Sequence, residues 1–452
     1  MAGTDRRIPI RSLLAAPIDG AEVTVTGWIK TSRFSKNVTF FEVYDGSTPQ
    51  TVQLVFPVPL PKEERTTYGI GTSIRASGSW VTSPGGGQDF EILVSDVQIV
   101  GSCDASKYPL QKKRTSLENL RSIAHIRPRT NTHQSVIRAR NALSWQIHKY
   151  FHDRGSAWIH TPIITGSDCE GAGELFHLHT GDPKEHFFGK QTYLTVSGQL
   201  EVECFAQSHT DVYTFGPTFR AENSNTPRHV AEFWMIEPEM AFADLDDVVA
   251  LAEDFVRVVA NGTLAECPED FDFFNTRIEK GVVDQVLQAI SKPFARVTYG
   301  EAQDVLVKSG KKFEFPVGWG THLQSEHERF LAEEHFKGPV FVTDYPIDQK
   351  AFYMRVNDDE KTVAATDLLM PRLGEILGGS QREERLGVLD QQFELRGIDS
   401  APLWWYRDLR RWGTTPHGGF GLGLERMLMW MTGMKNIRDV IPFPRTPGSA
   451  EF

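Results

Sequence analysis

The sequence is poor in cysteine and lacks any long apolar segment. Its 452 residues include four cysteines, and none stands in the CxxC spacing typical of zinc ligands or redox pairs. This scarcity argues against a disulfide scaffold and favours a reducing compartment. No apolar run approaches the ~18 residues that a membrane helix needs. The opening MAGTDRRIPI contains Asp5 and a proline but no apolar core of a secretory signal, so we expect a cytoplasmic protein.

Two common nucleotide-binding motifs are also missing. The sequence contains no GxxxxGK[ST] loop, and its glycines do not form GxGxxG after the first strand of a βαβ unit. Strands and helices do not alternate regularly beyond residue 133, which argues against a parallel, doubly wound sheet. We therefore expect an α+β domain built on an antiparallel β-sheet flanked by helices.

The N-terminal region has the pattern of a small barrel. Between residues 20 and 100, five short segments alternate apolar and polar residues with the period of strands, separated by turn signals such as DGS and SPGGGQ. Five strands in this length predict a barrel of the OB type, a fold that binds single-stranded oligonucleotides on an aromatic strand face. Phe40, Gln53 and Glu91 fall in the strands of that face, although ordinary strand residues fit the same pattern.

A basic segment follows the barrel in a chain whose net charge is −11. Residues 101–133 contain seven lysines and arginines against two acids, which gives a local charge of +5. Local patches, rather than the charge of the whole chain, decide nucleic-acid binding. We predict a barrel domain at 1–102, a basic linker or hinge at 103–132 and a larger domain at 133–452. A solvated linker and a linker that contacts nucleic acid fit the charge pattern equally well.

The helices and strands of the larger domain are predicted from periodicity. Apolar residues recur at helical steps in 133–151, 245–262 and 325–336, and Ser325 followed by Glu328 has the spacing of a capping box. The segments TYLTV, DVYTFGPTFRAE and VAEFWMIEPEMAF have the pattern of neighbouring antiparallel strands. A glycine-rich strand then enters an apolar helix in GGFGLGLERMLMW.

One charged hairpin stands out in this domain. The stretch FRAENSNTPRHVAEF carries Arg220, Glu222, Arg228 and His229 within ten residues, and Phe233 lies on the return strand. Residues two apart on a strand share a face, so Arg220 and Glu222 are expected to point the same way. An aromatic ring can stack on a base while an arginine forks onto phosphate, so the hairpin favours nucleotide binding over a solvated turn.

These segments resemble a known family. The charged hairpin resembles motif 2 of the class II aminoacyl-tRNA synthetases, GFGLGLERML resembles motif 3, and WIHTPIIT, with Pro162 on the dimer-forming strand, resembles motif 1. Longer stretches such as LTVSGQL, GGSQREERL and WWYRDLRRWGTTPHGGFGLGLER are similar to the asparaginyl members, and the resemblance extends over nearly the whole chain. It implies a homodimer that uses ATP and Mg²⁺ to attach L-asparagine to tRNA(Asn) through an asparaginyl-adenylate, releasing AMP and diphosphate.

The resemblance also implies where ATP would bind. The residues that it assigns to ATP are Arg220, Glu222, Arg228, His229, Phe233, Glu375 and Arg426. Arg220 would hold the α-phosphate and Phe233 would stack on adenine. Arg220, Arg426 and Glu375 would be catalytic, and Glu375 with Asp367 would bind Mg²⁺. Because the substrate carboxylate is already a nucleophile, the reaction needs positioning and charge neutralisation rather than a general base.

A third set of residues would select the amino acid. By resemblance, Glu170, Ser197 and Gln199 contact the α-amino and carboxyl groups of the substrate. Glu203 matches the glutamate that accepts from the side-chain amide NH₂, and Arg382 matches the arginine that donates to the amide oxygen. A glutamate at this place would repel aspartate.

Two neighbours of Glu203 bear on this assignment. Aspartyl members of the family carry a lysine where this chain has Val202, and a pocket for asparagine does not need that cation. The stretch EVECFAQSH departs from the usual family pattern and makes Glu201 a second candidate acid.

For the barrel, the resemblance implies recognition of the anticodon. Phe40 would stack on a base, Gln53 would contact the middle uridine, and Glu91 would lie near the third position. Three alternative functions stay open: an enzyme that also charges aspartate, an inactive RNA-binding paralogue, and an ammonia-dependent asparagine synthetase on the same catalytic fold. The barrel argues against the last, because a small-molecule ligase needs no anticodon reader.

Overall fold

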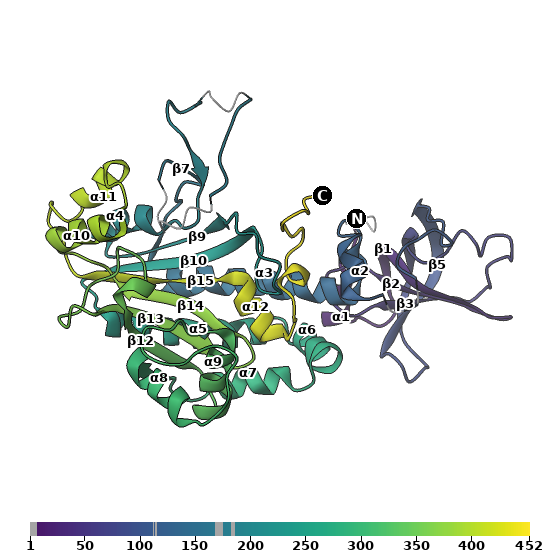
Figure 1. Ribbon diagram of the computed structural model, residues 1–452. Helices are drawn as coiled ribbons and strands as arrows, with labels where there is room; N and C mark the ends of the chain where they lie inside the picture. Colours follow the sequence, from purple (N-terminus) through teal and green to yellow (C-terminus); the bar gives the residue numbers. More distant parts are fainter. Residues whose placement is uncertain (1–6, 112, 114, 168–174, 182–185) are drawn as a thin grey trace. The chain divides into compact units, whose positions relative to one another are not determined.

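The computed structural model describes all of the chain except residues 1–6, 112, 114, 168–174 and 182–185. The chain divides into two compact units, Met1–Gln134 and Ser135–Phe452. Figure 1 follows the chain from the barrel strands in purple and blue to the last helix in yellow.

The first unit contains a closed barrel with the strand order β1-β2-β3-β5-β4. Its strands are β1 (Ala21–Phe34), β2 (Thr39–Tyr44), β3 (Val52–Phe56), β4 (Ser73–Thr82) and β5 (Phe90–Gly101). Neighbours run antiparallel apart from β3 and β5, which pair in parallel. Alternate residues point inward, so Phe41, Leu54 and Ile92 are fully buried. The expected OB-type barrel is confirmed.

A helix and a glycine complete the barrel. The helix α1 (Ile10–Ala15) packs Ile10 and Leu13 against the barrel core. Gly78 lies at an irregularity in the pairing of β4 with β5, where a Cβ would stand 2.1 Å from the carbonyl oxygen of Leu93. Glycine is required here because the two backbones approach so closely.

Part of the basic segment packs within the first unit. The helix α2 (Leu117–Arg121) is followed by the 3₁₀ turn η1 (Arg127–Arg129). Arg127 is buried, and the guanidinium carbon of Arg129 lies 5.5 Å from the ring centroid of Trp28 on β1. These two arginines are therefore structural and do not belong to a freely solvated linker.

The second unit is built on an eight-stranded sheet with the order β11-β12-β13-β14-β15-β10-β9-β6. Its strands are β6 (Ala157–Trp158), β9 (Asp211–Phe219), β10 (Glu232–Ala241), β11 (Ala295–Thr298), β12 (Val340–Pro346), β13 (Thr362–Met370), β14 (Gly374–Gln381) and β15 (His417–Gly423). The central pairs are antiparallel, whereas the edge pairs β11–β12 and β6–β9 are parallel. The expected α+β fold is confirmed.

A two-stranded sheet corrects one expectation. β7 (Ile164–Thr165) pairs with β8 (Tyr193–Leu194), so the TYLTV segment does not form a ladder with β9. Phe219 N still donates to Thr195 O at 2.8 Å. The contact cannot continue as a ladder because the chain turns into a helix at Gln199.

Helices flank the eight-stranded sheet (Figure 1). They are α3 (Asn131–Asp153), α4 (Gln199–His209), α5 (Leu245–Glu266), α6 (Pro268–Phe273), α7 (Val282–Ile290), α8 (Tyr299–Lys308), α9 (Ser325–Arg329), α10 (Leu386–Arg396), α11 (Trp404–Asp408) and α12 (Leu424–Thr432). Phe255 of α5 is fully buried, and its ring lies 5.7 Å from that of Phe420 on β15. Within the described residues, no helix is long and apolar enough to span a membrane.

Two local features of the helices position the site. The helix predicted near residue 325 begins at Ser325, but its capping box joins Gln324 with His327 instead of Ser325 with Glu328. The Glu328 carboxylate instead accepts a hydrogen bond from Glu375 N. Tyr406 of α11 is buried in an apolar cluster with Leu200 of α4, and Figure 1 shows these helices at one end of the sheet.

Candidate active site

A polar cavity of about 300 Å³ lies beside the β9–β10 hairpin. Its lining includes every residue that the sequence assigned to ATP, namely Arg220, Glu222, Arg228, His229, Phe233, Glu375 and Arg426. Gly421 and Gly423 of β15 also line the cavity and contribute no side chains to fill it. The structure therefore brings the predicted set together in one place.

Arg220 and Glu222 do not lie on the strand predicted for them. β9 ends at Phe219, and Arg220 N then donates to Ala231 O at 3.0 Å, where the hairpin opens into its loop. Both side chains nevertheless line the cavity. The guanidinium carbon of Arg220 lies 5.5 Å from the ring centroid of Phe233, and its Nη1 lies 4.0 Å from Glu222 Oε1.

Contacts on the hairpin loop hold its tip near the cavity. Arg228 Nη1 lies 3.3 Å from Ser325 Oγ at the start of α9, and Arg438 Nη1 donates to Thr226 O at 3.1 Å. Burial, helped by the neighbouring arginines, lowers the pKa of His229 and favours its neutral form.

Two carboxylates meet beside Gly378 of β14. A Cβ at Gly378 would lie 3.3 Å from Asp367 Oδ1 and 3.9 Å from Glu375 Oε1, so both acids border the space left by the missing side chain. Lys350 Nζ pairs with the two Asp367 oxygens at 2.7 and 2.6 Å. Burial raises the pKa of Asp367 although Lys350 opposes it. For Glu375 the effect of burial is outweighed by Arg426, Lys350 and other cations, and its pKa is lowered.

A third acid, Glu328, completes this cluster. Its Oε2 accepts from Glu375 N at 3.2 Å, while Arg426 Nη1 donates to Glu375 O at 3.1 Å. Burial, and then repulsion by Glu375, raises the pKa of Glu328 to about 7. Carboxylate oxygens are the ligands that Mg²⁺ prefers, so the donor set fits a hard divalent cation.

A second group of polar residues, the Glu203 cluster, centres on Glu203, a fully buried residue of α4. Its Oε1 accepts from Gln199 Nε2 and from the Tyr406 hydroxyl, each at 3.0 Å. Its Oε2 accepts from Arg410 Nη2 and lies against His417 Nε2, again at 3.0 Å. Burial acts to raise the pKa of this carboxyl, but Arg410 and the other nearby cations outweigh it and hold the pKa well below its usual range. Glu203 is thus an ionised hydrogen-bond acceptor.

Arg382 stands next to this acceptor. Its Nε and Nη2 donate to the two oxygens of Glu239 at 2.9 and 2.8 Å, and its Nη1 donates to Ser380 Oγ at 2.7 Å. Arg382 Nε lies 3.9 Å from Glu203 Oε1. A buried acceptor and a buried donor therefore lie side by side, which complements the NH₂ and C=O groups of a primary amide.

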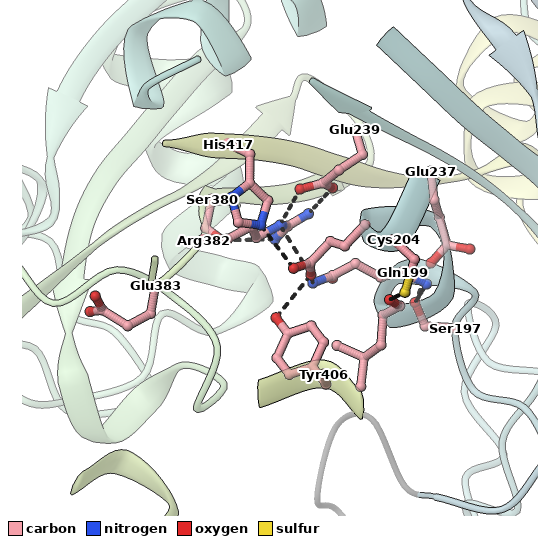
Figure 2. A network of polar contacts seen from close by, with 12 residues as sticks. Ser197, Gln199, Cys204, Glu237, Glu239, Ser380, Arg382, Glu383, Tyr406 and His417 are labelled. Carbon is pink, nitrogen blue, oxygen red and sulfur yellow. Dashed lines mark hydrogen bonds and ion pairs between the residues drawn. The ribbon is translucent and has the colours of Figure 1, made fainter. Parts of the chain in front are cut away.

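Ser197 and Gln199 lie at the start of α4, as Figure 2 shows. The Ser197 hydroxyl contacts Glu237, and Gly198 N donates to Glu237 Oε2 at 3.1 Å. Glu170, the third predicted contact to the substrate backbone, lies outside the described residues. Polar contacts thus join Ser197, Gln199, Glu203 and Arg382 in one cluster, with Glu237 beside them.

Comparison with known proteins assigns the chain to a family. A family model described as tRNA synthetases class II (D, K and N) matches residues 117–447, and one described as OB-fold nucleic acid binding domain matches residues 23–100. The asparagine–tRNA ligase of Thermosynechococcus vestitus is 54% identical to this chain, over 98% of this chain and 99% of its own length. The chain belongs to the asparagine–tRNA ligase family.

Further members and solved structures agree. The asparagine–tRNA ligase of Clostridium beijerinckii is 53% identical, over 99% of this chain and 100% of its own length. The asparaginyl-tRNA synthetase of Pyrococcus horikoshii, complexed with asparaginyl-adenylate, superimposes with a TM-score of 0.89 at 30% identity over 99% of both chains. The asparaginyl-tRNA synthetase of Entamoeba histolytica has a TM-score of 0.85 at 28% identity, covering 97% of this chain and 98% of that one.

The barrel places the three residues that resemblance to asparagine–tRNA ligases assigned to the anticodon on one face. Gln53 Nε2 donates to Glu91 Oε2 at 3.1 Å, from β3 to β5. Glu42 pairs directly with Gln53 between β2 and β3, and Phe40 lies two residues before it. Side chains two apart on a strand share a face, so Phe40 lies on the side of Gln53 and Glu91.

Sequence reasoning missed several residues of the Glu203 cluster. They are Glu237, Glu239, Tyr406, Arg410 and His417. A signal was available, because a buried acid requires cationic partners and the stretch YRDLRRWGTTPH supplies them. Glu203, Glu239 and His417 place one possible ligand atom each within 4.8 Å of one another. Two arginines already neutralise these carboxylates, so we assign no metal to this cluster.

Proposed function

We propose that this protein ligates L-asparagine to tRNA(Asn) in an ATP-dependent reaction of two steps. Asparagine first becomes asparaginyl-adenylate with release of diphosphate, and the terminal ribose of the tRNA then attacks the activated carbonyl with release of AMP. The observation that carries the proposal is the buried Glu203–Arg382 pair, which complements a side-chain amide. Asparagine-dependent exchange of labelled pyrophosphate into ATP tests the first step, and no exchange with any amino acid would contradict it.

The residues of the 300 Å³ cavity fit the first step. The substrate carboxylate attacks the α-phosphorus and needs no general base, so catalysis rests on orientation and charge. Arg220 would hold the α-phosphate, and Phe233 would contact the purine. Arg228 and Arg426 would neutralise charge that builds up on the departing diphosphate, and the neutral His229 would donate a hydrogen bond to it.

Glu375 and Asp367 would hold the Mg²⁺ that accompanies ATP. The space beside Gly378 and the carboxylate donors fit this ion. When bound, the ion would neutralise phosphate charge. Glu375 is the stronger candidate because Asp367 is already paired with Lys350. Glu328 holds the backbone of Glu375 and so fixes the position of its carboxylate.

A Glu375→Gln variant is expected to need more Mg²⁺. Loss of the carboxylate charge should raise the Mg²⁺ concentration for half-maximal pyrophosphate exchange by at least about 10-fold, the effect typical of losing even an indirect metal contact. Titration of the exchange rate with MgCl₂ measures this shift. Glu334→Gln is the matched control, because Glu334 pairs with Lys311 on the surface. Identical Mg²⁺ curves for Glu375→Gln and wild type would refute the assignment.

The barrel face that carries Phe40, Gln53 and Glu91 would bind the anticodon. The ring of Phe40 is partly exposed and has Arg33 5.9 Å from its centroid, so a stacked base would gain both aromatic and cationic contacts. The hydrogen bond from Gln53 to Glu91 fixes the orientation of both polar groups.

A Phe40→Ala variant tests this face. Loss of one stacking contact is worth ~1–3 kcal/mol. The Kd for tRNA(Asn), measured by filter binding at fixed salt, is expected to rise by about 5- to 150-fold. Val58→Ala, at an exposed site of the barrel unit, serves as control. An unchanged Kd for Phe40→Ala would remove Phe40 from the interface.

The protein would work as a homodimer that buries an apolar surface near Pro162. Two cavities, of about 460 and 540 Å³, share His148, Phe215 and Trp234 among their lining residues. Trp158 and Phe443 also line this region and are 57% and 44% exposed. A continuous apolar surface of this kind marks an interaction site.

A Trp158→Asp variant is expected to dissociate the dimer. A charge at the centre of an apolar interface would have to be buried without a partner. Sedimentation equilibrium should give twice the 50.9 kDa chain mass for wild type and a single chain mass for the variant. Leu395→Asp, at an exposed site on α10, should leave the mass unchanged. A monomeric wild type, or a dimeric Trp158→Asp, would contradict this interface.

We also propose a cellular location for the protein and weigh two alternative functions. The four cysteines, none of them in CxxC spacing, support our proposal that the protein acts in the reducing cytoplasm. A relaxed enzyme that also charges aspartate is disfavoured, because the ionised Glu203 would face the aspartate carboxylate. Arg220, Glu375 and Arg426 in one cavity argue against an inactive paralogue.

A further inference from the structure

Arg410 contacts Glu203 and has no assigned role in the two reaction steps proposed for the protein. Its Nη2 lies 3.0 Å from Glu203 Oε2 and donates to the Tyr406 hydroxyl at 2.8 Å, and its Nε donates to Glu383 O at 2.8 Å. The Tyr406 hydroxyl in turn donates to Glu203 Oε1 at 3.0 Å. Arg410 thus holds one oxygen of Glu203 directly and the other through Tyr406, and its side chain is fully buried.

The two oxygens of Glu203 have different neighbours. Arg410 and His417 contact Oε2, and His417 is itself fixed by a contact of 2.8 Å from Nδ1 to Thr415 O. Oε1 receives two neutral donors and is the oxygen that lies 3.9 Å from Arg382. The division suggests that Oε2 anchors the side chain while Oε1 faces the substrate.

The acceptor sites of the Glu203 carboxylate are already occupied before a substrate amide binds. A carboxylate offers about four lone-pair sites, and donors from Gln199, Tyr406, Arg410 and His417 contact it. An incoming amide NH₂ must therefore replace one donor. Gln199 is the replaceable one, because it is neutral and, on the proposed function, also contacts the substrate backbone.

The geometry points to Arg410 as a positioning residue that fixes Glu203 with Oε1 towards the substrate amide and thereby sets the preference for asparagine over aspartate. The inference rests on the proposed function, since Glu203 is taken to contact the substrate side chain. Arg410 itself touches no substrate atom and acts through Glu203 and Tyr406.

Removal of Arg410 would change the charge state of Glu203. The groups that hydrogen-bond to this carboxyl or act on it electrostatically are Gln199 and Glu201 from α4, Glu239 from β10, Arg382 directly after β14, Tyr406 from α11 and His417 from β15. Without Arg410, burial and the two neighbouring acids favour the protonated form. A protonated Glu203 carries an O–H that can donate to the carboxylate of aspartate. Selectivity would then fall as pH falls, because the proton comes from solvent.

Arg410→Met tests the inference, with Arg411→Met as its matched control. Arg411 is adjacent in sequence but pairs with Asp408 at 2.8 Å and is 42% exposed. Pyrophosphate exchange is measured with asparagine and with aspartate between about pH 6 and pH 8.5, a range across which a carboxyl with a raised pKa titrates. In Arg410→Met, the ratio of kcat/KM for asparagine to that for aspartate is expected to fall about 100-fold, mainly through the KM for asparagine.

The pH profile and the conservative variant separate positioning from a merely structural role. The ratio should fall further towards low pH in Arg410→Met and stay flat in Arg411→Met and wild type. Arg410→Lys keeps the charge and should restore part of the ratio. Equal losses for both amino acids at every pH would overturn the inference. If Arg410→Met fails to fold, Tyr406→Phe, which removes the link to Oε1, should lower the ratio, and an unchanged ratio there would also overturn it. A wild type that activates no asparagine would instead refute the proposed function.

Discussion

Replacing Arg220 by alanine is expected to reduce asparagine-dependent pyrophosphate exchange by at least about 10³-fold, since a guanidinium that neutralises a reacting phosphate contributes on this scale. Arg220 directly follows the last residue of β9, and its side chain lies beside Phe233. Both residues line the cavity that Glu375 and Arg426 also line. The loss should fall mainly on kcat, because the charge on the phosphorus oxygens grows in the transition state.

Two companion variants define what Arg220 does. Arg220→Lys keeps the charge but loses the planar fork, so it should recover only part of the rate. Arg296→Ala is the control, because Arg296 pairs with Asp246 at the surface of the same unit. Full activity in Arg220→Ala, measured against a wild type that is active, would remove Arg220 from the chemistry.

Glu203→Gln is expected to have the second large effect, a loss of about 10³-fold in kcat/KM for asparagine. The change keeps the shape of the side chain but leaves Arg410 and His417 facing an amide in a fully buried site. It also makes the pocket more positive, so aspartate should lose less than asparagine. Parallel pyrophosphate exchange with the two amino acids measures both changes.

Glu201→Gln is the control that tests whether Glu203, and not Glu201, is the acid that contacts the substrate amide. Burial, and then repulsion by Glu237 and Glu203, raises the pKa of Glu201 to about 7, so its charge is only partly present at neutral pH. Its replacement should change the preference for asparagine within about threefold, because residues two apart on a helix such as α4 do not face each other. A larger effect for Glu201→Gln than for Glu203→Gln would mean that the sequence register was assigned wrongly.

Local patterns in the sequence were enough to predict the barrel and the set of residues that line the 300 Å³ cavity. The barrel strands follow a period of two, and turn residues separate them. The residues that the resemblance assigned to ATP lie within short motifs. Arg220, Arg228 and Phe233 could therefore be assigned to one site before their contacts were known. The predicted strand for Arg220 and Glu222 was wrong because strand pairing gives way to a loop after Phe219.

The network of contacts around Glu203 could not be predicted in the same way. Glu203 on α4 meets Arg410 across 207 positions of sequence and His417 across 214. Spacing along the chain carries no information about such pairs. Only the folded sheet brings β14, β15 and β10 together around the buried carboxylate. The requirement that a buried acid be neutralised predicts that partners exist, but not which ones.

Aminoacylation of purified tRNA(Asn) by the wild-type protein, with asparagine and aspartate supplied separately at equal concentration, is the decisive measurement. The Glu203–Arg382 pair predicts that asparagine is charged and that kcat/KM for aspartate is lower by about 10⁴-fold or more. Comparable charging with aspartate would contradict the role given to Glu203, and charging with neither amino acid would contradict the proposed function.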